Sequence, residues 1–227
     1  MDLVYTLKRS PNRRKLAIIV ERDASVVVHA PTHTPTEKID SIVQSKRQWI
    51  YNKIHYSPKY RPLPHPPGRE LVNGEGILYL GRHYRIELVK DPTVPVRFNN
   101  KFYISSEQTA KRKQILREWY VLKAKEKILP RVEQYAQKLG VQYAAAKIMD
   151  SRYRWGSCTT KDNININWRL IKAPTFVIDY VIVHELAHLL EANHTKRLWT
   201  IIRTQIPKME QAKAWLKENG QTLEEDL

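Results

Sequence analysis

Two histidines four residues apart, His184 and His188, are the residues of this chain whose types and spacing best suit chemistry. They stand in the run His-Glu-Leu-Ala-His, and a third histidine, His194, follows six residues after the second. Histidines four apart on a helix project from the same face, one turn apart. That arrangement suits a tetrahedral metal such as zinc, and Glu185 beside the first histidine can act as a general base. The run therefore predicts a metal site with a base next to it.

His194 can join this site only if the helix ends before it. Six residues of a continuing helix rotate by about 240°, which would place His194 on the wrong face. We expect the chain to turn back under the metal, with Asn193 in a left-handed conformation. Three protein ligands would then leave the fourth position for water, as in catalytic zinc sites. Glu191, or a residue from elsewhere, is the alternative third ligand.

The chemistry expected of such a site is hydrolysis. The metal would lower the pKa of bound water toward about 7, and Glu185 would take the proton and deliver it to the leaving group. Residues 175–190 are apolar almost all round, which predicts a buried helix. Two histidines and a glutamate would be costly to bury there without a metal.

A second segment that could take part in chemistry is Arg-Trp-Gly-Ser-Cys at residues 154–158. Arg154 could stabilise an oxyanion or hold a carboxylate or phosphate of the substrate. Gly156 would let the backbone approach the substrate or the metal site closely. Alternatively, Trp155 packs on the metal-binding helix and Gly156 forms a bulge. Cys158 could be a ligand or nucleophile, but with three histidines available we interpret it as a small packed residue.

The strictly alternating run at residues 163–168 predicts a strand with one polar and one apolar face. We interpret it as a candidate edge strand for peptide binding by strand addition, with Asn165 and Asn167 as candidate substrate contacts. An ordinary amphipathic strand is the alternative.

Asp179 and Tyr180 precede the first histidine by about one turn. Either could support the ligands, although a carboxylate near a helix start is the simpler account of Asp179.

These motifs need a scaffold, and the pattern of apolar residues predicts an α+β fold. We expect a β-rich N-terminal region with one helix, residues 1–105, and a zincin-like metallohydrolase domain, residues 106–227, helical with a small antiparallel sheet. The proline-rich segment 57–68 is the expected internal boundary, since it excludes helix and central strand. Strands are expected at residues 2–7, 14–20 and 25–30 as an antiparallel meander, and at 76–80, 83–89, 94–98, 101–104, 142–149 and 163–168.

Helices are predicted from their apolar stripes and end signals. One begins at Thr34-Pro35, where the threonine can cap it. A long one covers residues 107–139, where Pro130 should kink or split it and Gly140 ends it. Three more follow at residues 174–191, 195–206 and 207–219, the last stopped by Gly220.

The net charge of +16 lies mostly outside the histidine-bearing part. Residues 1–61 carry 12 Lys and Arg against 5 Asp and Glu, whereas residues 140–227 carry 12 against 10. Such a surface favours nucleic acid, nucleotides or acidic partners, although a solvated charged surface is the simpler account.

The single cysteine fits a reducing compartment, and no apolar run is long enough to span a membrane, so we expect a cytoplasmic protein without membrane association.

Three segments resemble a known family: residues 153–158 (YRWGSC), 165–170 (NINWRL), and 179–183 (DYVIV) leading into the histidine run. Together they are similar to the YgjP-like zinc metallopeptidases, which are related to the WLM and SprT groups. The resemblance is close from about residue 140 to 205. It implies a minimal gluzincin-like core in which His184, His188 and His194 bind Zn²⁺ and Glu185 is the base. Glu191 stands where metzincins have glycine, so the chain is not assigned to that group.

Three functions follow from these observations. The leading hypothesis is a zinc metallopeptidase that acts on a peptide or protein. The second is a metal-dependent UTP pyrophosphatase, an activity attributed to the family. Against it, the sequence has no P-loop and no cluster of carboxylates for magnesium. The third is a nucleic-acid-associated protein with a structural zinc, in keeping with SprT relatives that act on proteins bound to DNA.

Overall fold

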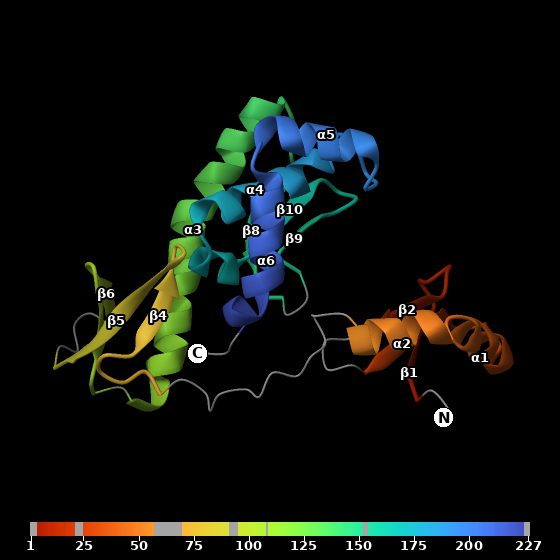
Figure 1. Cartoon of the computed structure of the whole chain (residues 1–227), viewed down its shortest axis with the longest axis horizontal. Coiled ribbons are helices and arrows are strands. Elements are labelled where there is room, and N and C mark those ends of the chain that lie inside the picture. The colour runs from red at the N-terminus through yellow and green to blue at the C-terminus, as the bar shows by residue number, and fades with distance from the viewer. Residues whose placement is uncertain are drawn as a thin grey trace. The chain divides into compact units, whose positions relative to one another are not determined.

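The computed structural model describes residues 4–20, 25–56, 70–90, 95–107, 109–151 and 154–224. The chain forms two compact units, residues 1–67 and 68–227, each with its own hydrophobic core (Figure 1). The fold is α+β, as predicted, with six α-helices and three small sheets in the described ranges. The units divide within the proline-rich segment, which lies outside the described residues, and not after residue 105. The predicted boundary after residue 105 is corrected because the strands between residues 76 and 105 share the core of the second unit.

The first unit is a three-stranded sheet covered on one face by two helices. Its strands are β1 (Thr6–Ser10), β2 (Ala17–Val20) and β3 (Val26–Pro31), and its helices are α1 (Thr36–Ser45) and α2 (Arg47–Tyr56). The sheet order is β1-β3-β2, with β3 parallel to β1 and antiparallel to β2, so the predicted meander is wrong. Strand β3 takes the central position, and its valines 26–28 are all buried.

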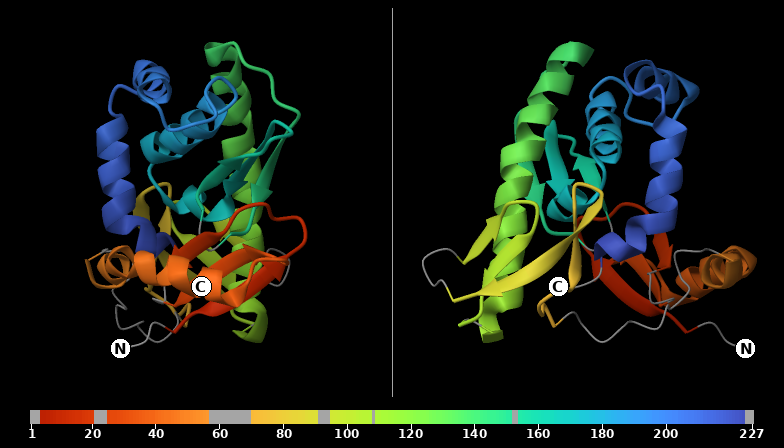
Figure 2. Two further views of the ribbon diagram at one scale, coloured as in Figure 1. Left: turned by 90° about the vertical axis from the view of Figure 1, so that its right-hand side faces the viewer. Right: turned by 60° about the vertical axis from the view of Figure 1, so that its left-hand side comes forward.

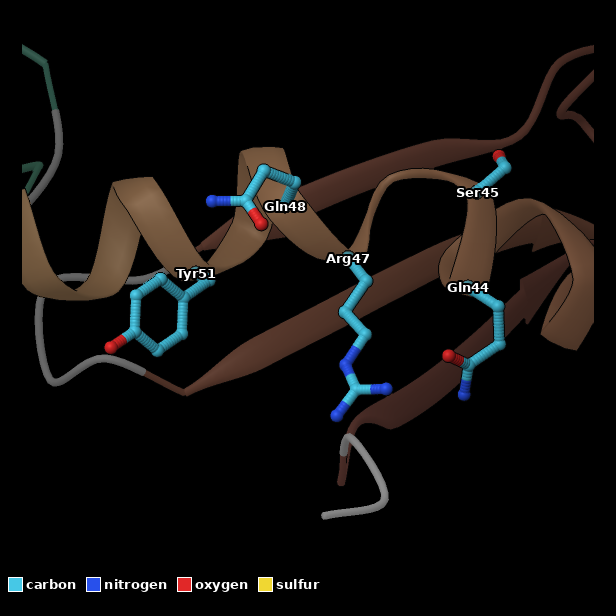
Figure 3. Close-up of a pocket in the computed structure, with 5 residues that line it drawn as sticks. All are labelled: Gln44, Ser45, Arg47, Gln48 and Tyr51. Carbon is cyan, nitrogen blue, oxygen red and sulfur yellow. The ribbon is translucent and has the colours of Figure 1, made fainter.

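The single helix predicted from Thr34 is in fact two helices that meet at Lys46. The first begins after Pro35, and no side chain caps its start. A shallow pocket of about 390 Å³ lies where α1 passes into α2 (Figure 3). Its lining consists of Gln44, Ser45, Arg47, Gln48 and Tyr51. This lining has neither a carboxylate nor a histidine, so it lacks the groups expected of a metal or general-base site.

The second unit begins with a four-stranded sheet packed on a long helix. The strands are β4 (Gly76–Tyr79), β5 (Arg82–Val89), β6 (Val96–Phe98) and β7 (Phe102–Ser105), in the order β4-β5-β7-β6. A 3₁₀ turn, η2 (Thr109–Lys111), leads into helix α3 (Arg112–Leu139). Aromatic rings join the sheet to the helix, with Phe102 and Trp119 in edge contact at 5.0 Å between centroids.

Helix α3 continues through Pro130 without a break, so the predicted split is wrong. Pro130 lies on the exposed side of the helix, where its missing hydrogen bond faces solvent. Gly140 ends the helix in the left-handed conformation, at φ 66°, as predicted. The buried stripe of the helix includes Leu116, Tyr120, Val132 and Ala136, whereas Leu122 is 50% exposed.

The third sheet and the last helices complete this unit (Figure 2). The sheet contains β8 (Ala145–Met149), β9 (Gly156–Cys158) and β10 (Asn163–Asn167), and a 3₁₀ turn, η3 (Trp168–Lys172), follows. The helices are α4 (Thr175–Ala187), α5 (Lys196–Gln205) and α6 (Met209–Glu224). Helix α4 contacts α3, α5, α6 and the third sheet and is therefore the central helix. No helix among the described residues is both long and apolar enough to cross a bilayer.

Two predictions about this region are corrected. Strand β10 is central, in the order β8-β10-β9, and is parallel to β8 but antiparallel to β9, so the small sheet is mixed and β8 and β9 form its two edges. Helix α6 runs past Gly220 instead of ending there. Gly220 is buried against Trp155, and a Cβ at this position would lie 3.3 Å from the indole Cζ2. This glycine therefore serves close packing and not helix termination.

Candidate metal centre

Helix α4 presents its histidines at the end of a buried segment. Val177, Ile182, Val183 and Leu186 are fully buried, which fixes the rotation of the helix. The helix ends at Ala187, and His188 occupies the cap position, earlier than the predicted end at residue 191. The helix therefore stops before the third histidine, as the spacing requires.

The chain then turns tightly into α5. The backbone N–H groups of Leu190 and Glu191 both donate to the Ala187 carbonyl, at 3.0 Å. Asn193 is not left-handed, contrary to expectation. Its carbonyl accepts a hydrogen bond from the Thr195 N–H at 2.8 Å, and Thr195 in turn caps α5 through its hydroxyl. The turn back is thus made by overlapping backbone hydrogen bonds and a cap.

The three predicted histidines converge. Their candidate ligand atoms all lie within 4.8 Å of one another, and no other described group of three His, Cys, Asp or Glu side chains offers such a cluster. The Nε2 atoms of His184 and His194 are 3.2 Å apart. Two nitrogens bound to one tetrahedral zinc at 2.0–2.1 Å would lie roughly 3.3 Å apart. The spacing therefore fits a shared metal, and Glu191 and Cys158 lie outside the cluster.

The hydrogen bonding of the rings also fits a metal. His188 Nδ1 lies 3.1 Å from the Glu191 carbonyl, so the Nδ1–H form donates there and leaves Nε2 as a ligand. His184 Nδ1 is buried without a partner, and His184 Nε2 faces only the His194 ring nitrogen. A metal between the two Nε2 atoms would replace this close contact of ring nitrogens, while the Nδ1 of His184 would stay without a partner.

Electrostatics favours the neutral form of His184. Burial, the largest cause, acts together with repulsion from His188, His194 and Lys213 to lower its pKa to about 4. Neutral imidazole is the form that binds metal, so His184 needs no deprotonation near neutral pH.

Strand β9 lies directly against Glu185. The glutamate is only 8% exposed, and the backbone N–H of Cys158 donates a hydrogen bond to its carboxylate. A Cβ on Gly156 would lie 2.6 Å from Glu185 Cγ and 2.8 Å from Oε1. Burial raises the pKa of Glu185 to about 7, against the opposing effects of the Cys158 hydrogen bond and the Arg154 charge. The close approach predicted for Gly156 is therefore to the candidate base.

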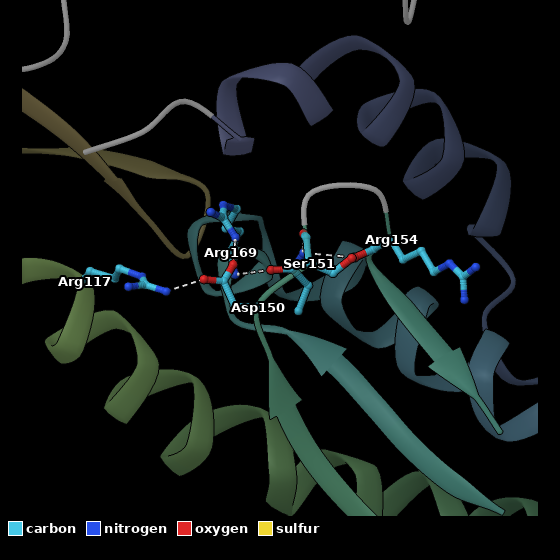
Figure 4. Close-up of polar contacts among 6 residues, drawn as sticks. Arg117, Asp150, Ser151, Arg154 and Arg169 are labelled. Carbon is cyan, nitrogen blue, oxygen red and sulfur yellow. Dashed lines mark hydrogen bonds and ion pairs between the residues drawn. The ribbon is translucent and has the colours of Figure 1, made fainter. Parts of the chain in front are cut away.

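The other candidate substrate residues differ in their exposure and in their contacts. Arg154 is exposed, and its side chain extends away from the polar contacts around Asp150 (Figure 4). Trp155 packs on Gly220 of α6. Asn165 is half-buried and donates to the Ser157 hydroxyl at 3.2 Å.

Asn167 is corrected from a substrate contact to a buried structural residue. It is 1% exposed, its amide nitrogen donates to the Ser151 and Arg154 carbonyls, and its amide oxygen accepts from the Arg169 N–H. No polar atom of this side chain is left for a substrate.

Two features near the site were missed in the sequence. Trp199 lies 5.6 Å from the His184 ring and 5.7 Å from the His194 ring, between centroids, and so forms one wall of the centre. The signal in the sequence that Trp199 faces the site is its place four residues after the Thr195 cap. Asp179 lies beyond the first turn of α4 and binds a side chain of another helix. It forms a two-hydrogen-bond ion pair with Arg131 of α3, at 2.5 and 2.6 Å.

Comparisons with known proteins show the family of this chain. The model of the YgjP-like family, metallopeptidase domain, matches residues 14–219. A solved structure, the metallopeptidase zymogen abylysin of Pyrococcus abyssi, is 18% identical with a TM-score of 0.39, over 41% of this chain and 95% of that chain. No curated protein is similar enough to match. Because the family model spans most of the sequence, as the motifs predicted, this chain belongs to the YgjP-like metallopeptidase-domain family.

Proposed function

We propose that this protein is a zinc-dependent peptidase in which His184, His188 and His194 hold the metal and Glu185 is the general base. One observation carries the proposal: three imidazoles converge at a ligand spacing beside a buried carboxylate. Family membership supports metallopeptidase activity in general. The choice of zinc is supported by the all-nitrogen donor set and the 3.2 Å separation of two ligand atoms.

The protein's own residues supply the rest of the chemistry. When bound, the metal would polarise the scissile carbonyl and acidify a water molecule. A carboxylate with a pKa of about 7 can both accept and return a proton near neutral pH, and Glu185 has this property. The Cys158 N–H orients that carboxylate, and Trp199 shields the imidazoles on one side.

The geometry moves the proposed substrate edge from β10 to β9. Strand β9 is one edge of its sheet and lies beside Glu185, so a peptide added to it would pass the base. Arg154, just before this strand, is exposed and close enough to influence Glu185 electrostatically. We assign it the role of holding a negatively charged group of the substrate.

The two other hypotheses are tested by the same assays. The exposed charge of Arg154 would also suit a nucleotide phosphate. The described residues of the first unit carry nine Lys and Arg against two Asp and Glu, which would suit a nucleic acid. Neither observation supplies a base or a metal ligand, so both remain secondary to the peptidase.

The deciding experiment measures bound metal and then compares wild type with Glu185→Gln on three substrates. We expect one zinc per chain in both proteins, and cleavage of an unfolded protein that disappears with chelator and with Glu185→Gln. Loss of pyrophosphate release from UTP in the same variant would favour the nucleotide hypothesis. Salt-dependent DNA binding without hydrolysis would favour a structural zinc. Absence of stoichiometric metal, with activity unchanged in His188→Ala, would refute the proposal.

A further inference from the structure

The described residues just before β9 are 150, 151, 154 and 155, and each of them is held by a polar contact. Asp150 forms ion pairs with Arg117 of α3 and Arg169 of η3 (Figure 4). The carbonyls of Ser151 and Arg154 accept hydrogen bonds from one amide nitrogen, at 2.5 and 2.9 Å. That nitrogen belongs to the buried side chain at position 167.

Asn167 is the common point of these contacts. Its backbone N–H also donates to the Trp155 carbonyl, at 2.8 Å. Its amide oxygen accepts from the Arg169 N–H at 3.0 Å, which caps η3. One residue thus joins the end of β10, the start of η3 and the segment before β9.

The next residue after this anchored segment is Gly156, the one packed against the candidate base. Strand β9 has only three residues, and its register with β10 is set by Gly156 opposite Ile166, directly beside Asn167. A strand so short has little pairing energy of its own, so its position depends on what holds its ends. The Cys158 N–H that meets Glu185 lies on the same strand.

We infer that Asn167 is a positioning residue for the general base: it holds β9 against Glu185 and thereby sets the direction of the carboxylate. The inference rests on the proposed function, since it assigns Glu185 a catalytic role. It requires an asparagine in particular, because the position needs both a two-hydrogen donor and an acceptor.

The test replaces the amide donor and keeps the acceptor. Asn167→Asp retains the oxygen that caps η3 but turns a carboxylate oxygen toward two carbonyls. We expect kcat to fall on the order of 10–100-fold, the effect of a misplacement near 1 Å, with KM changed less than threefold. Zinc content should stay at the wild-type level, because the ligands lie on α4 and the turn after it. Asn167→Ala serves as the second variant if Asn167→Asp folds poorly.

A control in the same strand receives the same chemical change. Asn163 also uses its amide nitrogen to hold a backbone carbonyl, that of Lys161 at 3.2 Å, but in the turn after β9. Asn163→Asp should leave kcat and zinc content unchanged. An equal loss of kcat in both variants would overturn the inference, because it would show a general weakening of β10.

A readout independent of activity separates this inference from the proposed function. Hydrogen exchange of the Cys158 amide, measured by NMR on the full chain, reports the bond to Glu185. We expect exchange to accelerate on the order of tenfold in Asn167→Asp and to stay unchanged in Asn163→Asp. If wild type hydrolyses nothing, the proposed function fails while the exchange data still decide whether Asn167 holds β9. Unchanged exchange, or faster exchange with kcat unaltered, would overturn the inference.

Discussion

A methyl group added at Gly156 should disable the proposed base while leaving the metal in place. The Cβ of Gly156→Ala would lie 2.6 Å from Glu185 Cγ, 2.9 Å from Cδ and 2.8 Å from Oε1. An ordinary carbon contact is 3.4–4 Å, so one side must move by about 1 Å. Glu185 is 8% exposed and belongs to the central helix, so it has little room to retreat.

The size of the effect follows from that displacement. A shift of about 1 Å in a catalytic group can cost roughly 100-fold in rate. Crowding in a packed region typically costs about 1–3 kcal/mol of folding free energy. We therefore expect kcat/KM for peptide hydrolysis to fall by roughly 100-fold, while zinc remains bound one to one. Steady-state kinetics, metal analysis and urea unfolding measure the three quantities.

Two comparisons show whether the effect passes through Glu185. Gly140→Ala strains a left-handed helix end, at φ 66°, with open space around it, so it should lose stability without losing activity. The double variant Gly156→Ala with Glu185→Gln should be no less active than Glu185→Gln alone, since residues that act as a unit are not additive. The reasoning is refuted if Gly156→Ala keeps wild-type activity, or if its loss adds fully to that of Glu185→Gln.

Three further predictions concern metal binding and stability. His188→Ala should lose stoichiometric zinc. Chelation should then lower the melting temperature of wild type but not of this variant, because a metal that binds only the folded state stabilises that state. An equal shift of the melting temperature in both proteins would contradict this prediction. Arg131→Ala should cost roughly 2–3 kcal/mol in urea unfolding, because it leaves the buried Asp179 carboxylate without its charged partner; a loss below 0.5 kcal/mol would show that the pair matters little. For Asp150, burial raises the pKa but hydrogen bonds from its two arginine partners outweigh that effect and hold the pKa below its usual value. Its ion pairs should therefore stabilise the fold above about pH 4 and lose that contribution as the pH falls through the folded-state pKa, so urea unfolding of Asp150→Asn should change less between pH 7 and pH 3 than wild type.

The histidine cluster could be predicted from the sequence because the relations among its members are local. His184 and His188 are fixed by helix periodicity, and His194 is reached after one turn whose necessity follows from the same periodicity. Gly140 could be predicted as a helix end for a similar reason, since a left-handed cap depends on its immediate neighbours. The turn at Asn193 was predicted wrongly because backbone hydrogen bonds, which composition does not reveal, replace the left-handed residue.

The parts of the site that depend on distant contacts could not be predicted. The contact between Gly156 and Glu185 joins residues 29 positions apart, on a three-residue strand too short to show a period. Arg131 and Asp179 are 48 positions apart, and their types alone do not indicate that they pair. Residues 163–168 predicted a strand correctly, but alternation describes its two faces and not its neighbours, so an edge could not be told from a central strand.

This difference in origin should make the proposed metal binding and the proposed catalysis separable. The candidate ligands lie at the end of α4 and in the turn into α5, whereas the candidate base lies against β9, and an asparagine anchors the segment before that strand. Changes in the first region should remove zinc and activity together. Changes at Gly156 or Asn167 should remove activity from a protein that still holds its zinc. A variant of β9 that lost the metal would show that the two regions are one structural unit. The proposed separation of metal binding from orientation of the base would then be wrong.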